Sequence, residues 1–412
     1  MNCVPNIFTI YNNKKWITFD DTIIFNFNFN SKLDIELISG YSKLIFSDYE
    51  FDERLFKYYE NRYFHNCEFH NNYEDCYAHN CHIYKILNKG YFHQLKHKKS
   101  RFNKNVSNLP DSITHLTFGC KFRKDVPKLP SSLTHLTFGD YFEKDVPNLP
   151  SSLTHLIFGT FFNQDVSNLP SGLTHLTFGE FFNQDVFVLP SSLTHLTFGH
   201  CFNKDVSKLP SSLIHLKFGA YFNQDVSNLP NGIIHLNFGL FFNQDVSSLP
   251  HSLTHLIFYC SFNQDVSKLP PTLTHLILSG CFNQDISKLP QSLTHLSLGY
   301  EFDKKCYIPP NIKYLKLNCN NSYLFDSLPN SIIELELNSD MNREYEFNLQ
   351  LDNLPTSIKK LLINKNSHYD ANINCLPDFI EELQLNYKYK KRILHIPPNL
   401  KKIVCHEGYP YK

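Results

Sequence analysis

The chain has 412 residues, of which 42% are hydrophobic, enough for an extensive core. Its 39 basic and 39 acidic residues cancel, so no net charge attracts it to nucleic acid or to an anionic membrane. No apolar run of about 18 residues predicts a membrane span, and the first residues do not resemble a secretion signal. The 12 cysteines form no disulfide-like framework. We therefore expect a cytoplasmic monomer that binds neither nucleic acid nor membrane.

The first 101 residues differ from everything that follows. They contain one proline, Pro5, and no clear repeat apart from a faint echo in YSKLIFSDYEFDERL at 41–55. We predict strands near 15–46 and a short helix near 51–63. Residues 1–101 are therefore interpreted as a mixed N-terminal cap for the repeats that begin at residue 102.

A group of cysteines and histidines lies within this cap, in the stretch CYAHNCHIYKILNKGYFHQLKH. Cys76, Cys81, His93 and His97 have a spacing close to that of a zinc finger, but it is one residue short and the interior apolar residues are misplaced. Two interpretations stay open. One is a structural zinc site, and the other, which we favour, is a tyrosine- and histidine-rich cap without metal or other cofactor.

From residue 102 onward the sequence repeats with a period of 20. Phenylalanine recurs at every twentieth position from Phe102 to Phe302, and each unit reads approximately F-N-Q-D-V-S-x-L-P-x-S-L-T-H-L-T-F-G-x-x. Leu-Pro pairs mark ten regular units over residues 102–301. Five degenerate units follow over residues 302–412 and include the C-terminal cap.

Each unit is too short for a pair of helices, which needs about 33 residues or more. It fits one coil with one short strand. Alternation along that strand places Leu136 and Phe138 inward and His135 and Thr137 outward, while Phe122 fills the core from the returning side. A coil of this size is stabilised by stacking on its neighbours. The predicted fold is a repeat solenoid of parallel β coils.

The pattern F-N-x-x-[VI]…L-P-x-S-L-x-x-L-x-F-G resembles the FNIP repeat, which is abundant in amoebae and in the large DNA viruses that infect them. It is also similar to short leucine-rich repeats. The unit here is shorter than usual, and Asp-Val stands where Pro-Ile is common. The resemblance implies a leucine-rich-repeat-like scaffold that binds a protein partner through its concave face, in the host cytoplasm if the protein is viral. Some members carry an F-box before the repeats, and residues 1–101 lack its Leu-Pro start and leucine-rich helices. A ubiquitin-ligase adaptor with a cryptic F-box-like segment stays an alternative.

Two positions after the conserved glycine vary from unit to unit and lie at the edge of the expected concave face. We interpret them as candidate partner contacts, with aromatic anchors. The alternative is that the aromatic side chain tucks beside the core phenylalanine. The candidates are Asp140, Tyr141, Thr160, Phe161, Glu180, Phe181, His200, Tyr221 and Phe241.

A histidine is kept in every regular unit and is expected to form a column on the concave face. The column comprises His115, His135, His155, His175, His195, His215, His235, His255, His275 and His295. We interpret it as a stack of mostly neutral rings ordered by the flanking threonines, with a pKa lowered by mutual repulsion. His175, His195 and His215 are also candidate partner contacts. Metal binding is the alternative, although no carboxylate or thiolate cluster accompanies the column. The sequence contains no catalytic motif, so we expect a protein that is not an enzyme.

Charged residues replace this histidine in the degenerate units. Glu334, Lys360, Glu382 and Lys402 alternate in sign at the equivalent position. Adjacent strands lie about 4.8 Å apart, so opposite charges on one face attract. The alternation predicts that the degenerate units continue the same parallel, in-register stack.

Overall fold

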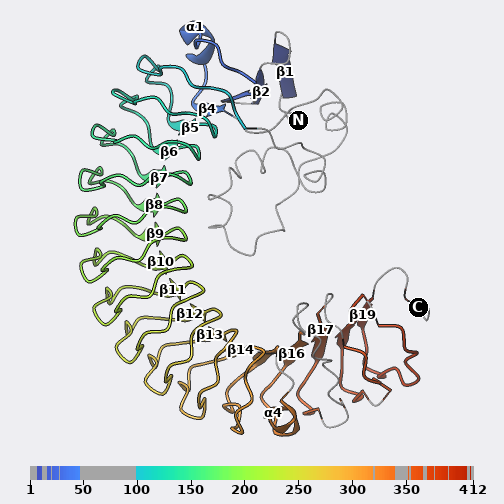
Figure 1. Ribbon diagram of the computed structural model, residues 1–412. Helices are drawn as coiled ribbons and strands as arrows, with labels where there is room; N and C mark the ends of the chain where they lie inside the picture. The colour runs from blue at the N-terminus through green and yellow to red at the C-terminus, as the bar shows by residue number, and fades with distance from the viewer. Residues whose placement is uncertain are drawn as a thin grey trace, which may run out of the picture. The chain divides into compact units, whose positions relative to one another are not determined.

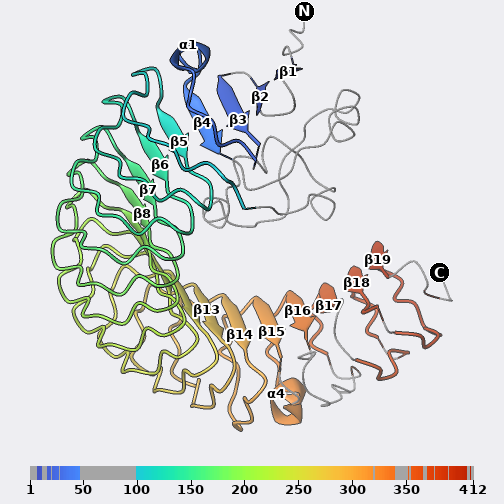
Figure 2. The same cartoon turned by 45° about the horizontal axis from the view of Figure 1, so that its top comes forward.

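The computed structural model describes residues 7–11, 16–19, 21–26, 28–46, 99–318, 321–338, 351, 354–364, 369–374, 376–387, 389–405 and 409. The fold is a parallel β-solenoid with coils of roughly 20 residues and little helix. The chain divides into two compact units, Met1–Phe202 and Asn203–Lys412. Within each unit the repeat strands lie side by side in chain order (Figures 1 and 2).

The first unit begins with an antiparallel meander, in which β2 pairs with β1 and with β3. From β3 onward every consecutive pair is parallel. A single helical turn, α1, is capped by the side chain of Asp34, which accepts bonds from two backbone N–H groups. The elements are β1 (Ile7–Tyr11), β2 (Trp16–Phe19), β3 (Thr22–Phe25), α1 (Ile35–Ile38), β4 (Lys43–Phe46), β5 (His115–Thr117), β6 (His135–Thr137), β7 (His155–Ile157), β8 (His175–Thr177) and β9 (His195–Thr197).

The faint echo at 41–55 is part of the stack. Its strand β4 pairs in parallel with β5, and Leu44 aligns with Leu116. The parallel ladder therefore starts within the region expected to be a mixed cap, before residue 102. The strands expected near 15–46 are present, whereas the helix expected near 51–63 lies outside the described residues.

The second unit consists of parallel coils, with consecutive strands from β10 to β19 in register. Its elements are β10 (His215–Lys217), β11 (His235–Asn237), β12 (His255–Phe258), β13 (His275–Leu278), β14 (His295–Leu298), β15 (Tyr314–Leu317), α4 (Ser322–Asp326), β16 (Glu334–Leu337), β17 (Lys360–Ile363), β18 (Glu382–Gln384) and β19 (Lys402–Val404).

The predicted charge alternation is confirmed. Lys360 aligns with Glu334 on one side and with Glu382 on the other. Its Nζ lies 3.8 Å from a carboxylate oxygen of each. Lys402 aligns with Glu382, at 3.7 Å. The degenerate repeats over residues 302–412 thus keep the register of the regular repeats.

Most regular coils contribute two phenylalanines, two leucine-type residues and one valine-type residue to the core, and Leu278 and Leu298 replace one phenylalanine in the last two. Phe118, at the end of a strand, stacks on Phe122 from the returning side with ring centroids 3.8 Å apart. Phe122 in turn lies 6.1 Å from Phe142 of the next coil. Leu133 and Leu136 fill the remaining interior and are buried. Because each coil has this same arrangement, the apolar residues form continuous columns.

The glycine that follows most of the regular strands is required by the approach of neighbouring backbones. A Cβ added at Gly159 would lie 2.2 Å from the carbonyl oxygen of Gly139, and one at Gly179 would lie 1.9 Å from that of Gly159. Among the described glycines only Gly280 has a positive φ, of 62°. At most of these positions glycine is therefore required because the coils lie close together, and not because the turn needs a positive φ.

Polar side chains on the returning side join the coils. The Asn183 N–H donates to Oδ1 of Asn163 at 2.9 Å, and Nε2 of Gln184 donates to the Asn163 backbone oxygen at 3.1 Å. Within a coil, the Ser167 N–H donates to Oδ1 of Asp165. These bonds satisfy backbone groups that the three-residue strands leave unpaired. Among the described helices, none is long and apolar enough to cross a bilayer.

Candidate interaction surface

The histidines of the first unit form a continuous stack. Consecutive rings from His115 to His195 have centroids 4.1 Å apart and are inclined by 10° to 12°. Each ring is half-buried, and the leucine that follows it points into the core. Stacked neutral rings at this distance make favourable contacts, whereas charged rings repel. The histidine column predicted from the sequence is therefore present on the sheet face opposite the core.

A threonine hydroxyl precedes most of these rings and orders them, as the sequence predicted. Oγ1 of Thr134 lies 2.9 Å from Nδ1 of His135 and donates to the backbone oxygen of Thr114 at 3.1 Å. A hydroxyl that donates to this carbonyl accepts from Nδ1–H, which leaves the other ring nitrogen as an acceptor. The bond recurs in eight of the ten regular coils. His215 and His235 follow Ile214 and Ile234 instead.

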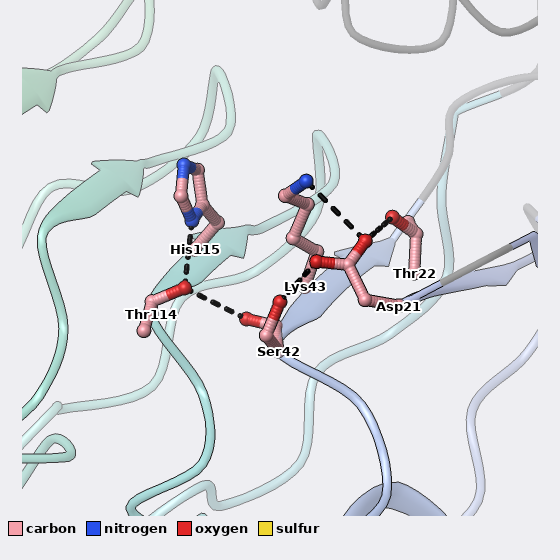
Figure 3. Close-up of polar contacts among 6 residues, drawn as sticks. All are labelled: Asp21, Thr22, Ser42, Lys43, Thr114 and His115. Carbon is pink, nitrogen blue, oxygen red and sulfur yellow. Dashed lines mark hydrogen bonds and ion pairs between the residues drawn. The ribbon is translucent and has the colours of Figure 1, made fainter.

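A lysine begins the column in the first unit. Lys43 aligns with His115 and pairs with Asp21 at 3.3 Å (Figure 3). The hydroxyls of Ser42 and Thr22 also donate to the Asp21 carboxylate. Partial burial alone would raise the pKa of Asp21, but the bonds from Ser42 and Lys43 outweigh it and lower that pKa. The Thr114 hydroxyl also donates to the Ser42 backbone oxygen at 3.3 Å, so these contacts extend from β3 through β4 to the start of β5.

The histidines of the second unit continue the pattern and end on Tyr314, which aligns with His295. Successive ring centroids from His215 to Tyr314 lie 4.4, 4.2, 4.0, 3.8 and 4.1 Å apart. Burial is the first cause that lowers the pKa of His255, to about 4, and neighbouring imidazoles lower it further. Burial and a neighbouring imidazole also lower the pKa of His275 and of His295. The prediction that the pKa is lowered is confirmed for these three histidines. Repulsion between rings is the cause expected from the sequence, whereas burial is the larger cause.

An aromatic stack runs along the edge of the first unit. The rings of Tyr141 and Phe161 have centroids 5.0 Å apart, and those of Phe161 and Phe181 are 5.2 Å apart. Phe161 is 36% exposed and Phe181 is 45% exposed. At the Tyr141 end, Nζ of Lys99 and the guanidinium of Arg123 each lie 4.7 Å from the ring centroid. Two cations thus cover one end of an exposed apolar stack.

The second unit has an equivalent pair. Tyr221 and Phe241 stack at 5.2 Å and are 56% and 47% exposed. The interpretation that these aromatics tuck beside the core phenylalanine is therefore wrong for Phe161, Phe181, Tyr221 and Phe241. We call Tyr141, Phe161 and Phe181 the aromatic edge, and Tyr221 and Phe241 are the corresponding pair of the second unit.

The other variable position, just before each edge aromatic, is polar in the first unit. The Thr160 hydroxyl donates to Oδ1 of Asp140 at 2.9 Å, and the Cys120 thiol donates to Oδ2 at 3.4 Å. Glu180 and His200 are exposed. A row that mixes charge and hydroxyl groups therefore lies along the aromatic edge.

Sequence reasoning missed a second variable column. The third residue of each strand lies on the same sheet face as the histidine and changes from coil to coil, which was the available signal. In the second unit this column comprises Lys217, Asn237, Ile257, Ile277 and Ser297. Lys217 and Ile277 are exposed. The histidine column is therefore flanked by residues that vary in charge and polarity.

The zinc candidates Cys76, Cys81, His93 and His97 lie outside the described residues, so the zinc interpretation stays a prediction. Among the residues that the structure does describe, no group of three or more histidine, cysteine, aspartate or glutamate side chains is arranged to hold a metal ion.

Comparison with known proteins gives a family match and several structural likenesses. The FNIP Repeat family model matches residues 124–161, 145–181, 162–201, 202–241, 225–261, 242–281 and 304–340. No match to a curated protein was found. CroV588, a circular LRR protein of the giant virus CroV, is 34% identical with a TM-score of 0.53, over 76% of this chain and 56% of CroV588. The chain thus spans little more than half the length of that relative.

Two bacterial structures are more distant. YopM from Yersinia enterocolitica is 20% identical, with a TM-score of 0.42, over 74% of this chain and 72% of its own. The functional domain of InlJ from Listeria monocytogenes is 17% identical, with a TM-score of 0.41, over 67% of this chain and 64% of its own.

Proposed function

Because this chain is an FNIP-repeat-containing protein with a leucine-rich-repeat-like fold, we propose that it is a non-enzymatic scaffold that binds a protein partner. The proposed contact surface is the sheet face that carries the histidine column, together with the aromatic edge. Solenoids of this kind offer extended surfaces on which neighbouring coils each contribute a few side chains. On this surface the residues beside the histidines vary from coil to coil, while the buried core repeats.

The exposed aromatic edge is the observation that carries the proposal. Phe161 and Phe181 stack on each other yet leave more than a third of their surface open to solvent. Aromatic residues that are exposed in a free protein and bordered by polar groups are typical anchors of protein interfaces. Asp140, Glu180 and His200 supply such a border.

Several polar groups of the types that enzymes use in catalysis have structural partners here. Most of the column histidines bond to a threonine, and Asp165 and its equivalents bond to serines. These interactions repeat from coil to coil and define no single reaction centre. They support a binding role. We also propose a monomer in the cytoplasm, or in the host cytoplasm for a viral protein. The ubiquitin-ligase adaptor and the zinc protein stay alternative predictions.

Affinity capture from cells of the natural source, with quantitative mass spectrometry, tests the proposal. The test variant is Phe161→Ser with Phe181→Ser, which removes two edge anchors. The matched control is Phe187→Ser, which removes an exposed phenylalanine from the returning side of a neighbouring coil. We expect partners that are retained by the wild type and the control but lost by the edge variant. Equal capture by all three proteins would contradict the proposed surface.

A further inference from the structure

The last described coil of the second unit, residues 391–405, has an open side. Ile403 aligns with Leu383 in the neighbouring strand, yet Ile403 is 45% exposed and Leu383 only 1%. Ile396 of the last Leu-Pro-type step is 65% exposed, whereas Leu376 of the preceding step is 2% exposed. The position of Ile403 is buried in every other described repeat coil, and the position of Ile396 is buried or half-buried there, yet both residues lie at a surface here.

Among the described residues, no strand pairs with the outer edge of β19. Within the stack, the Lys359 backbone oxygen accepts bonds from the N–H groups of Glu381 and Glu382, and the Glu381 oxygen accepts from Lys401 and Lys402. The next oxygen in this series belongs to Lys401, and no donor from residues 389–405 or from residue 409 reaches it. An edge of this kind is a template for another strand.

Charge supplies the specificity of this edge. Lys360 lies between two glutamates. Within the part of the chain that the structure describes, Lys401 and Lys402 pair with glutamates on one side only, Glu381 and Glu382 respectively. The side chains of Lys401 and Lys402 are 73% and 61% exposed, compared with 42% for Lys360. The alternating ladder therefore ends on two adjacent positive charges.

The described part of the C-terminal segment, Tyr409, packs on the returning side of the last coil and does not cover Ile403 or Ile396. Tyr409 is buried, its hydroxyl donates to the Lys391 backbone oxygen at 2.9 Å, and its ring lies 6.4 Å from that of Tyr389. This packing covers Tyr389, on the returning side of the coil. Ile403 and Ile396 keep their exposure in its presence.

We propose that β19 is a docking edge for an extended segment of a partner protein, which adds one more parallel strand. The segment carries two consecutive acidic residues opposite Lys401 and Lys402, then an apolar residue opposite Ile403 and a second one opposite Cys405. Backbone bonds to β19 provide the attachment, and the acidic pair sets the register. Lys402 lies on the sheet face that carries the histidine column, but the docking element proposed here is the backbone edge of β19 and not that face. The proposal therefore goes beyond the function proposed above.

Fluorescence anisotropy with the 412-residue chain tests this docking edge. The probe is a labelled synthetic peptide with the sequence of residues 376–387, whose Glu381–Glu382 pair already faces these lysines in the stack. The control peptide has both glutamates replaced by lysine. We expect the acidic peptide to bind about tenfold more tightly than the control, because like charges directly opposite each other repel.

The protein variants make the test reciprocal. Lys401→Glu with Lys402→Glu is expected to reverse the preference between the two peptides. Since that change also places four acidic groups together, Lys401→Gln with Lys402→Gln serves as a milder variant that is expected to abolish the preference. A melting curve identifies any loss of folding. Absence of binding to the wild type, equal binding of both peptides, or a preference unchanged in the glutamine variant would overturn the proposal.

Discussion

Thr254 and His255 are joined by a 2.8 Å hydrogen bond between Oγ1 and Nδ1, and the same hydroxyl donates to the Ile234 backbone oxygen of the preceding coil at 3.3 Å. One side-chain hydroxyl thus fixes an imidazole ring and joins two coils. The ring of His255 then stacks between His235 and His275. Because this relationship recurs along the stack, the threonine–histidine pair is a structural unit of the repeat.

Removing the hydroxyl tests that role. Thr254→Val keeps the shape of the side chain and leaves Nδ1 of His255 without its threonine partner. We expect the free energy of unfolding to fall by about 1 kcal/mol, the usual contribution of one such bond. The matched control is Ile234→Val at the equivalent position of the coil before, where no hydroxyl is lost, and it should cost less. Urea unfolding followed by circular dichroism measures both values, and equal losses would contradict the assigned role.

Acid should destabilise the histidine column. The folded-state pKa of His255 is about 4, below its ordinary value of 6.5, because burial and neighbouring rings disfavour the charged form. The unfolded chain therefore takes up protons first, and stability falls as pH drops from about 6.5 toward 4. Replacing His255, His275 and His295 with Asn should reduce the stability that is lost between pH 6.5 and pH 4 by about 1 kcal/mol in total. The effect is small because solvent screens half-buried rings. Stability at pH 8 should change little.

His200→Asn provides the control for the pH experiment, because His200 is exposed and lies outside the column. This variant should keep the acid sensitivity of the wild type. Unfolding curves at several pH values measure the slope. A triple variant that loses stability in acid as steeply as the wild type would show that the column does not govern the response.

The core can be tested by comparing a buried phenylalanine with an exposed one. Phe198 is 2% exposed and stacks on Phe202 at 3.7 Å, so Phe198→Ala should cost about 3–5 kcal/mol. Phe187 is 42% exposed, and Phe187→Ala should stay within about 0.5 kcal/mol of the wild type. Thermal or urea unfolding distinguishes them. A loss below about 1 kcal/mol for Phe198→Ala would contradict the register of the coil.

The glycine column makes an equally sharp comparison. Gly179→Ala would place a methyl group 1.9 Å from a backbone oxygen of the preceding coil, and the coils must separate to admit it. We expect a loss of at least about 1–3 kcal/mol. At Gly40 an added Cβ meets no atom within 4 Å, so Gly40→Ala should be neutral or slightly stabilising. If both variants melted at the same temperature, the close approach of the coils would be refuted.

The zinc interpretation has a direct chemical test. We expect purified protein to contain well below one equivalent of zinc, and a chelator to leave its circular dichroism spectrum and melting curve unchanged. One equivalent of zinc, lost together with part of the folded signal in Cys76→Ser with Cys81→Ser, would establish the metal site instead.

The repeat made much of the fold predictable. The 20-residue spacing of Phe122 and its equivalents indicated one coil per unit, and alternation placed Leu136 inside. The alternating signs of Lys360 and Glu382 predicted the register between strands far apart in the sequence, because charges one strand apart on a sheet face interact directly. β4 was harder to place, since 52 residues separate Phe46 from Lys99, the next residue that the structure describes.

Other features depend on three-dimensional distances that the sequence does not contain. Phe161 and Phe162 are neighbours of the same type, yet Phe162 is buried and Phe161 is exposed, because the turn after the strand directs one inward and the other along the edge. The need for glycine at residue 179 depends on the gap to the preceding backbone. The main cause of the lowered pKa of His255 is burial, which depends on how closely the coils stack.

The most direct test of the account is the affinity of a purified partner, once captured, for three forms of this protein. Isothermal titration would measure the Kd for the wild type, for Phe161→Ser with Phe181→Ser, and for Phe187→Ser. If the aromatic edge anchors the partner, the double variant should bind at least about tenfold more weakly, while the control stays within about twofold of the wild type. Equal affinities for all three forms would contradict the central claim that the edge of the solenoid is its binding surface.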